Sequence, residues 1–394
     1  MSATTTVILG GGFGGIAAAN SLRRLLTAEH EIVVIDESPR FHVGAGKTWI
    51  MLGERTYDQI SQSRAALLAP GIRLVEASVQ SISLPARTMS AGSELLKWDA
   101  LVIALGADLD LTVVPGLAEA AHTFYTVEGA QRLRGVLEQF SGGDVAMLIP
   151  KAPFKCPPAP YEAAMLLHAM FRRRGLSGKA RLSIHTVEGA PMATAGPEMG
   201  QFIKNELAQR DIAYFPQRIT PRIDLAAQRV VFGDGSEARY DLLIAIPPHV
   251  APEVVRDAQL TDPSGWIPVD PTTMHVKHPG DAGEVYAVGD VTVVPLPGRY
   301  KPDVGLALPK AGVFAEAQGR IAAHRIAAKI LGRTTDEAFD GKGFCFLETG
   351  DKRAVKAEGS FFELPHPIMQ KRAADEAQLI DKLDWVERLL RPLT

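Results

Sequence analysis

Short apolar runs alternate with helical patterns along the first third of the chain. Residues 7–9 and 32–35 are apolar runs of the length expected for buried strands, and residues 16–26 between them form a helical pattern. Residues 72–79 and 101–104 are expected to form further strands. Strands that alternate with helices in this way predict a parallel sheet with right-handed crossovers.

A second unit of the same kind follows. Residues 145–149 predict a strand, a proline-rich loop comes next, and a helix is expected over about residues 161–174. The strand and helix pattern thus occurs twice, which predicts two nucleotide-binding units, the second inserted within the first. Farther along, strands are expected at residues 181–187, 242–246, 285–288 and 344–347, and helices at residues 311–331 and 371–390.

Composition narrows the class of protein. With 394 residues, the chain is long enough for two or three domains. Its hydrophobic fraction of 46% is ordinary, and its net charge of −3 gives no reason to expect a nucleic-acid partner. No apolar run approaches the ~20 residues that span a bilayer, and the chain starts without the basic and apolar regions of a signal peptide. We therefore expect a cytoplasmic protein.

A glycine-rich turn lies between the first predicted strand and helix. The segment Gly10-Gly11-Gly12-Phe13-Gly14-Gly15 fits the pattern G-x-G-x-x-G through Gly10, Gly12 and Gly15. Its glycines permit a tight turn and let a pyrophosphate approach the helix N-terminus, where free N–H groups and the dipole favour negative charge. Asp36, followed by Glu37, ends the next predicted strand, where a carboxylate can bind ribose hydroxyls. These residues predict a dinucleotide site.

Two later segments favour FAD over NAD as the ligand of this site. Residues 98–107, which read WDALVIALGA and include Ala104 and Gly106, resemble the "YDxLVIATGA" segment of flavoproteins with two dinucleotide-binding domains. Gly289-Asp290 resembles the second FAD signature of these proteins, whose aspartate binds the ribityl chain. The resemblance also implies that Val79 contacts adenine through its backbone. It places the segment Pro309-Lys310-Ala311-Gly312 at the flavin, where a helix start would stabilise negative charge on the reduced ring.

The implied fold is an α/β fold with two Rossmann-like domains of the glutathione-reductase type, the second inserted in the first. We expect residues 1–112 and 281–332 to form the FAD-binding domain. Residues 113–280 are expected to form the second, degenerate Rossmann-like domain, and residues 333–394 a C-terminal region.

The second unit lacks the glycine-rich turn with which related flavoenzymes bind NAD(P)H. Residues 150–162 contain five prolines instead, and proline removes N–H donors and fixes φ, so this loop does not cradle a pyrophosphate. NAD(P)H is therefore not the expected substrate. The loop presents Cys156 just before a helix N-terminus, where a thiolate is expected to be stabilised.

The loop also resembles a known family. Residues 155–162, which read KCPPAPYE, resemble the KCPPGPYE loop of flavocytochrome c sulfide dehydrogenase, and Cys345 matches the second redox cysteine of the sulfide:quinone oxidoreductase superfamily. The resemblance implies a Cys156–Cys345 disulfide beside the flavin. Hydrosulfide would attack this disulfide, and electrons would pass through FAD to an acceptor. Glu162, in the first helical turn, is a candidate proton acceptor near Cys156, or else a favourable partner of the helix dipole.

The acceptor is expected to be a membrane quinone. Without an export signal a cytochrome c partner is disfavoured, and residues 379–390 predict an amphipathic helix with Trp385 and flanking arginines, which suits a peripheral contact with the inner face of the cell membrane. The same helix pattern also fits packing on the protein or on a second subunit in a homodimer. Phe361 and Phe362 would line a quinone path or belong to the core.

Other interpretations stay open at this point. Buried inert thiols would explain both cysteines, and the scattered histidines, His249 among them, predict no metal site. The alternative functions are a type II NADH:quinone oxidoreductase, a cytochrome c-linked sulfide dehydrogenase flavoprotein, and a non-catalytic, redox-regulated FAD-binding protein.

Overall fold

The first parallel sheet joins the start of the chain to a segment near residue 286. The computed structural model describes residues 3–278 and 283–393. The strand order is β20-β9-β1-β2-β5, and all neighbouring pairs are parallel, which confirms the expected sheet. Its strands are β1 (Thr5–Leu9), β2 (Glu31–Asp36), β5 (Arg73–Glu76), β9 (Ala100–Ile103) and β20 (Val285–Ala287).

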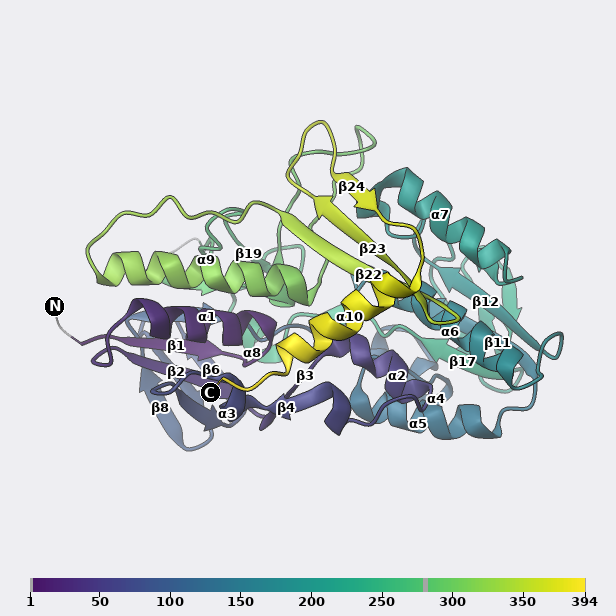
Figure 1. Ribbon diagram of the computed structural model, residues 1–394, viewed down its shortest axis with the longest axis horizontal. Coiled ribbons are helices and arrows are strands. Elements are labelled where there is room, and N and C mark those ends of the chain that lie inside the picture. Colours follow the sequence, from purple (N-terminus) through teal and green to yellow (C-terminus); the bar gives the residue numbers. More distant parts are fainter. Residues whose placement is uncertain (1–2, 279–282, 394) are drawn as a thin grey trace.

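Two helices cover one face of this sheet and pack against each other through small residues. They are α1 (Phe13–Leu25) and α9 (Gly312–Ile330), which lie side by side in Figure 1. Gly319 lies where the two backbones meet, because a Cβ atom there would be 2.2 Å from the carbonyl oxygen of Gly14. This close approach fixes the N-terminal ends of both helices next to each other.

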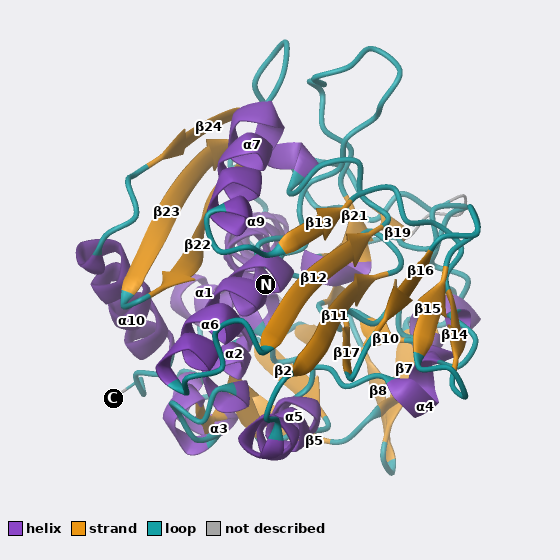
Figure 2. Ribbon diagram, turned by 90° about the vertical axis from the view of Figure 1, so that its right-hand side faces the viewer, coloured by secondary structure: helices purple, strands orange, loops and turns teal. Residues whose placement is uncertain are grey.

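The second parallel sheet has the strand order β13-β12-β11-β17 (Figure 2). Helix α6 begins at Ala159, two residues before the expected start, because prolines are tolerated in the first turn of a helix. The strands are β11 (Gly143–Ile149), β12 (Ala180–Thr186), β13 (Ala213–Phe215) and β17 (Leu242–Ala245), and the helices are α5 (Val127–Gln139), α6 (Ala159–Arg173) and α7 (Gly196–Ala208).

The last part of the chain forms an antiparallel sheet and a helix. The sheet consists of β22 (Lys342–Gly350), β23 (Arg353–Ser360) and β24 (Ile368–Lys371), and the helix is α10 (Glu376–Leu389). β22 packs along α6 of the second unit, and α10 packs on β23. The expected helix start at residue 371 is wrong, because β24 pairs with β23 through that residue and Asp375 caps the helix by accepting the N–H of Gln378.

A second expectation also fails. The single strand expected over residues 72–79 is two strands, β5 and β6 (Val79–Ser83). The chain leaves the first sheet at Ala77, whose N–H donates to the carbonyl oxygen of Asp36. It then enters the antiparallel sheet of β6, β7 (Thr88–Ala91) and β8 (Glu94–Lys97).

The buried residues gather mainly in two large cores. Apolar residues between Ala251 and Val276 belong to the core of the first sheet, although our domain limits assign residues 113–280 to the second unit. The core of the second sheet also includes Trp49, Leu347 and Val386, so the C-terminal region packs on the second unit. The expected boundary between residues 280 and 281 lies outside the described residues, and the domain limits stay a prediction.

The remaining elements are short. The strands are β3 (Arg40–His42), β4 (Ser61–Ser63), β10 (Asp108–Leu109), β14 (Arg222–Asp224), β15 (Arg229–Val231), β16 (Glu237–Arg239), β18 (His249–Val250), β19 (Ile267–Pro268) and β21 (Thr292–Val293). The helices are α2 (Lys47–Met51), α3 (Arg64–Leu67), α4 (Leu117–Ala120) and α8 (Glu253–Asp257). The described residues also include five 3₁₀ turns, of which η5 (Gly289–Val291) follows β20.

The contact between α1 and α9 predicts a large cost for a single methyl group. Replacing Gly319 with Ala should lower the free energy of unfolding by about 1–3 kcal/mol, because the added Cβ meets backbone that cannot move aside. Gly135→Ala is the matched control, since Gly135 lies within α5 with nothing within 4 Å of its Cβ position, and it should stabilise by up to about 1 kcal/mol. Urea unfolding measures both. Equal stabilities of the two variants would contradict this packing.

Candidate active site

One cavity of about 970 Å³ lies where the two parallel sheets and the C-terminal sheet meet. Its size is at the upper end of the range for ligand sites, which suits a dinucleotide. Every residue that the sequence predicts for the site lines the cavity except Gly15. The lining residues among them are Gly10, Gly12, Phe13, Gly14, Asp36, Glu37, Val79, Ala104, Gly106, Cys156, Glu162, Gly289, Asp290, Lys310, Ala311 and Cys345.

Gly15 does not line the cavity but allows α1 to pack against the glycine-rich turn. A Cβ atom there would lie 1.8 Å from the carbonyl oxygen of Gly10, so only glycine lets α1 pack this closely on the turn. Gly10 itself has φ of 94° and leaves no room for a Cβ atom beside Ala104. Gly12, by contrast, has nothing within 4 Å of its Cβ position. The three glycines therefore form a tight turn that leaves its backbone open to a ligand.

Two helix N-termini at the cavity favour negative charge. Neither α1, which follows Gly12, nor α9, which follows Ala311, has a side-chain cap or an acidic residue in its first turn. Their first N–H groups are therefore available to a ligand. α1 suits the pyrophosphate of FAD, and α9 suits the flavin, whose reduced form is anionic. The residues present fit FAD, the cofactor that this chain binds.

Asp36 is held in place by the turn. Its carboxylate accepts the N–H of Gly11 at 2.8 Å and forms an ion pair with Arg64 at 3.1 Å. Arg64 also donates to the carbonyl oxygen of Gly11. Arg64 is buried, and sequence analysis missed it because it comes from α3, far from the glycine-rich segment. Ribose binding by Asp36 stays a prediction.

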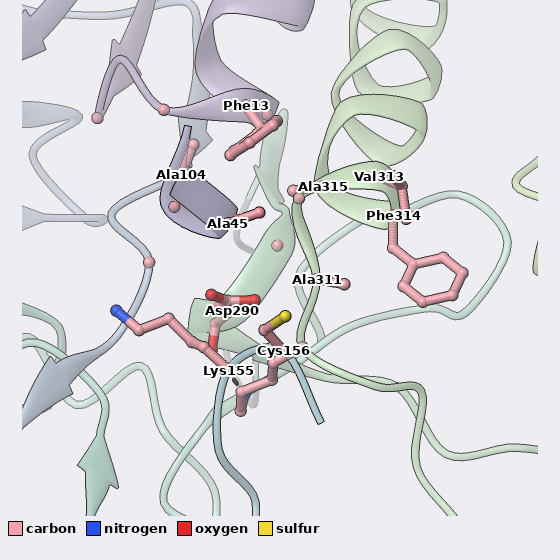
Figure 3. A pocket seen from close by; sticks show the side chains of 18 of the residues that line it. Phe13, Ala45, Ala104, Lys155, Cys156, Asp290, Ala311, Val313, Phe314 and Ala315 are labelled. Carbon is pink, nitrogen blue, oxygen red and sulfur yellow. Dashed lines mark hydrogen bonds between the residues drawn. The ribbon is translucent and has the colours of Figure 1, made fainter. Parts of the chain in front are cut away.

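Cys156 lies beside the start of α9, at the end of the cavity where the flavin is expected. Figure 3 shows its side chain beside Asp290 and Ala311, at the end opposite Phe13 and Ala104. The Cys156 N–H donates to the carbonyl oxygen of Lys310 at 2.8 Å. Cys156 has φ of 55°, a left-handed conformation that only surrounding structure maintains in a residue with a side chain. The conformation of its loop is therefore held by the surrounding structure.

The side chains of Tyr125, His249 and Lys155 form hydrogen bonds that hold this loop in place. The Tyr125 hydroxyl donates to the carbonyl oxygen of Lys155 at 2.9 Å, and the Lys155 N–H donates to Nε2 of His249 at 3.3 Å. The Lys155 ammonium turns away and donates to the carbonyl oxygen of Ala107. His249 is buried, and burial together with Lys155 lowers its pKa to about 3, so it stays a neutral acceptor. It thus supports the cysteine loop and does not line the cavity.

The ammonium group of Lys310 points into the protein and binds backbone carbonyl oxygens there. The ammonium donates to the carbonyl oxygens of Asp290 and Thr292 and lies 3.4 Å from the ring centre of Trp266. The ammonium is therefore not free to bind the flavin, and contact through the backbone of Lys310 stays a prediction. Lys47, which sequence analysis missed, also lines the cavity, and its ammonium donates to the carbonyl oxygen of Tyr125 at 2.6 Å. Burial, together with Lys155, lowers its pKa to about 7.

The second cysteine reaches the same cavity from β22. Cys345 pairs in register with Ala357 of β23, and its side chain lines the cavity together with Cys156. Both are free thiols in the structure. The expectation of a stabilised Cys156 thiolate is wrong, because burial, and next the charge of Glu162, raise the pKa of Cys156 to about 12. Burial, and next Cys156, raise the pKa of Cys345 to about 12.

A buried ion-pair network joins the two cysteine-bearing elements. The ammonium of Lys382 lies 3.0 Å from Oε1 of Glu162 and 2.6 Å from Oε1 of Glu348. The backbone N–H of Glu348 donates to Oε2 of Glu162 at 2.9 Å, and the indole N–H of Trp49 donates to Glu348 at 2.8 Å. Lys382, Glu162 and Glu348 are at most 5% exposed. Glu162 on α6, Glu348 on β22 and Lys382 on α10 thus hold three elements together.

Burial acts on these charges in opposite directions. It raises the pKa of Glu162, although Lys382 opposes the rise. For Lys382, burial lowers the pKa, but the two carboxylates outweigh this and the net shift is upward. Lys382 was not predicted, because a lone lysine among the charged residues of an amphipathic pattern gives no sign of burial.

Aromatic side chains form another wall of the cavity. Trp385 stacks with Phe13 at 6.3 Å between ring centres and meets Phe344 and Phe346 at 6.0 Å. All four rings line the cavity, as does the buried Phe361. This wall suits a flat apolar molecule such as a quinone ring.

A buried tyrosine contacts the acidic residue at the carboxyl end of β12. In a Rossmann unit this end carries the acidic residue that binds ribose. Here Glu188 follows β12, and the buried Tyr161 of α6 donates its hydroxyl to Glu188 at 2.6 Å. Burial raises the pKa of Glu188 to about 7. The prolines of the turn and this side-chain contact favour the prediction that the second unit binds no NAD(P)H, which stays a prediction.

Comparisons with known proteins agree with this geometry. A model of the pyridine nucleotide-disulphide oxidoreductases matches residues 4–149, and a model of the central part of the flavoprotein chain of flavocytochrome c sulfide dehydrogenase matches residues 130–247. The mitochondrial sulfide:quinone oxidoreductase of Mus musculus is 25% identical over 91% of this chain and 78% of its own length. The sulfide-quinone reductase of Aquifex aeolicus is 25% identical over 88% of this chain and 81% of its own length.

The fold is also that of a solved structure. The X-ray structure of the sulfide:quinone oxidoreductase from Aquifex aeolicus has a TM-score of 0.85 with this chain at 23% identity, over 98% of this chain and 90% of that one. This confirms the fold of two Rossmann-like domains.

Removal of Lys382 should strongly destabilise the protein. Lys382→Met leaves two buried carboxylates without a cation, and we expect the free energy of unfolding to fall by about 3–5 kcal/mol. Adding Glu162→Gln and Glu348→Gln to this variant removes the uncompensated charges and should recover part of the loss. Urea unfolding gives both values. A Lys382→Met variant as stable as the parent would show that the network does not hold the three elements together.

The raised thiol pKa values predict slow alkylation. With a pKa of about 12, both cysteines of the reduced protein are protonated at neutral pH, and the reactive thiolate appears only as the pH rises. The rate of alkylation by iodoacetamide, followed by mass spectrometry, should still be rising above about pH 10, where a free thiol with a pKa of about 8.5 has reached its plateau. A plateau near neutral pH would mean that the thiolates are stabilised after all.

Proposed function

We propose that this chain, which belongs to the flavoprotein family of the sulfide:quinone oxidoreductases and the sulfide dehydrogenase flavoprotein chains, oxidises sulfide and passes the electrons to a quinone. One observation carries the proposal. The two cysteines, separated by almost two hundred residues, line the same cavity, and Cys156 is hydrogen-bonded at the start of the helix that faces the flavin site. The cavity also offers an aromatic wall for the acceptor.

The proposed chemistry starts from a disulfide between Cys156 and Cys345. Hydrosulfide attacks one sulfur, a new S–S bond forms to it, the Cys–Cys bond breaks, and its electron pair stays on the other cysteine as a thiolate. FAD supplies a two-electron acceptor for the sulfur and a donor for the quinone. Glu162 lies close enough to Cys156 to raise the pKa of the thiol, and we propose that it accepts the proton of the incoming sulfide.

Burial of the two cysteines would protect a sulfur intermediate from reaction with thiols in solution. The cysteines are accessible only in part, between α6, β22 and the start of α9, so a bound persulfide is shielded from bulk thiols. Lys47 brings positive charge to this end of the cavity, which favours entry of the hydrosulfide anion.

The NADH:quinone alternative receives no support from the second unit. Pro157 and Pro158 at the start of α6 have no N–H for a pyrophosphate, and Tyr161 occupies the carboxylate that would bind ribose. A cytochrome acceptor remains a specific alternative, because the matched family model belongs to a flavocytochrome. The non-catalytic alternative predicts no turnover with sulfide and quinone, so an activity assay decides it.

A peripheral contact with the membrane completes the proposal. Within residues 3–278 and 283–393, no helix has the length and the apolar character to cross a bilayer. The expected membrane helix does not offer its apolar face, since Val386 is fully buried and Leu383, Leu389 and Leu390 pack on the second core. This favours the other interpretation of the helix, packing on the protein. The inner face of the cell membrane and a homodimer stay predictions.

The test is sulfide-dependent quinone reduction. The parent protein should bleach its flavin absorbance with sulfide and pass the electrons to quinone. Cys156→Ser and Cys345→Ser should each lower the rate at least about a thousandfold, as for loss of other covalent nucleophiles, while FAD stays bound. The visible spectrum of the purified variants serves as the control for FAD.

Three results would contradict the proposal. Bleaching by NADH but not by sulfide would favour an NADH:quinone oxidoreductase. Transfer to cytochrome c but not to quinone would favour the flavocytochrome alternative. Full activity of either serine variant would remove the cysteines from the mechanism.

A further inference from the structure

Lys47 is a cavity-lining lysine whose ammonium group uses only part of its hydrogen-bonding capacity. It is the first residue of α2, and it is half-buried. Its ammonium donates to the carbonyl oxygen of Tyr125 at 2.6 Å, and within residues 3–278 and 283–393 it has no second acceptor and no carboxylate at ion-pair distance. An ammonium group has three N–H donors. Two donors of Lys47 are therefore left for a negatively charged group in the cavity.

The position of Lys47 is tied to the loop that carries Cys156. Tyr125 accepts the ammonium through its backbone carbonyl, and its hydroxyl donates to the carbonyl oxygen of Lys155, the residue before Cys156, at 2.9 Å. The Lys47 ammonium also lies 6.0 Å from the centre of the Tyr125 ring. The buried Tyr125 thus holds both the ammonium and the cysteine loop. Lys47 and Cys156 lie close enough for the charge of each to change the pKa of the other.

The Lys382 network brings no net positive charge to Cys156. The Lys382 ammonium donates to both oxygens of Glu162 and to Glu348, which uses its three donors. Two carboxyl groups thus face one ammonium group. The negative charge of Glu162 accordingly acts on the pKa of Cys156 more strongly than the positive charge of Lys382 does. A further cation is needed to stabilise negative charge on the sulfur of Cys156.

Other cations that line the cavity are engaged elsewhere. Lys155 donates to the carbonyl oxygen of Ala107, and Figure 3 shows its ammonium on the side away from the sulfur of Cys156. The remaining cations bind backbone carbonyl oxygens or a carboxylate, in the case of Lys310 those of Asp290 and Thr292, and in the case of Arg64 those of Gly11 and Asp36. Lys47 is therefore the cation with free donors near Cys156.

The two cysteines differ in the charges around their sulfur atoms. Burial, and next Glu162, raise the pKa of Cys156, but this rise is opposed. The opposing groups are Lys382, the backbone N–H of Ala159 at the start of α6, and Lys47. For Cys345, burial, Cys156 and Glu162 all raise the pKa. When the disulfide opens, Cys156 is therefore the better place for the negative charge.

We propose that Lys47 is a further catalytic residue, whose ammonium group donates to the sulfur of Cys156 when the disulfide opens and the electron pair of the broken bond stays on that sulfur. In this step hydrosulfide forms a bond to the sulfur of Cys345, and the bond between Cys345 and Cys156 breaks. Cys345 keeps the added sulfur as a persulfide, and Cys156 becomes the thiolate. The inference rests on the proposed sulfide oxidation and names the group that stabilises its leaving sulfur.

The charge of Lys47 itself depends on several neighbouring elements. Burial, and next Lys155, lower its pKa to about 7. Three groups oppose this, namely Cys156, Asp290 of η5 and Glu128 of α5. His42 of β3 also faces Lys47, but burial lowers the pKa of His42 to about 4, so it stays neutral. Lys47 therefore keeps its proton below about pH 7 and loses it as the pH rises above that value.

The first experiment is alkylation of the reduced, FAD-containing protein by iodoacetamide at about pH 6.5, where Lys47 keeps its proton, with each cysteine followed by mass spectrometry. Lys47→Met should lower the rate at Cys156 about three- to tenfold, because loss of a nearby cation raises the pKa of the thiol. The rate at Cys345 should stay unchanged. Lys151→Met is the matched control, since Lys151 is an exposed lysine of the same loop, and it should change neither rate.

The second experiment is the rate of flavin reduction by sulfide as a function of pH, compared between the parent and Lys47→Arg. Arginine stays protonated throughout, and the ratio of the two rates cancels the ionisation of sulfide itself. The ratio of parent to variant should be constant below about pH 7 and fall above it, because the parent loses the proton of Lys47. Lys47→Met should be slower than Lys47→Arg by about tenfold or more at every pH. The visible spectrum of each variant shows whether FAD stays bound.

Three results would overturn the role of Lys47. They are an unchanged rate at Cys156 in Lys47→Met, an equal loss of rate at Cys345, and a ratio of parent to Lys47→Arg that does not depend on pH. Failure of the proposed function looks different. A parent whose flavin is not reduced by sulfide at all would refute sulfide oxidation, whereas the alkylation rates would still show whether Lys47 stabilises the thiolate of Cys156.

Discussion

The ion pairs of Lys382 with Glu162 and Glu348 hold the site together. Glu162 follows Cys156 by six residues at the start of α6, and Glu348 follows Cys345 by three on β22. Joining the two carboxylates through one buried ammonium fixes the register of β22 along α6, and with it the approach of the two cysteines. A buried ion pair adds little net stability compared with apolar packing, but it penalises every arrangement that leaves a charge unpaired. Here it specifies where the C-terminal sheet docks.

The FAD site was predictable because it is encoded locally. The glycine turn, Asp36 and the start of α9 each depend on residues within a few positions, and their geometry follows from φ, helix ends and strand ends. The parts that sequence analysis missed depend on tertiary contacts. Arg64, Lys47 and Lys382 come from other elements, and nothing in their local sequence distinguishes them from surface cations. The tail helix shows the same limit, because its apolar pattern fits a membrane and a protein core equally well.

The cysteines show that local sequence can predict the wrong direction of a pKa shift. A helix N-terminus favours a thiolate, but the benefit is about 1 kcal/mol, whereas burial and the neighbouring Glu162 act against the charge and are stronger. The second unit illustrates the complementary case. Its proline turn disfavours NAD(P)H already in the sequence, and in the structure Tyr161 donates to the carboxylate of Glu188 that could otherwise meet a ribose. We propose that this Rossmann unit positions a cysteine rather than a second cofactor.

The central claim is that Cys156 and Cys345 form one redox pair. Peptide mapping of the air-oxidised protein by mass spectrometry, under conditions that prevent thiol exchange, tests it most directly. We expect a single disulfide-linked species that joins the peptides of the two cysteines, which brief sulfide treatment converts into unlinked peptides with one added sulfur atom on one cysteine. Oxidised protein in which both cysteines are recovered as free, unmodified thiols would contradict the account.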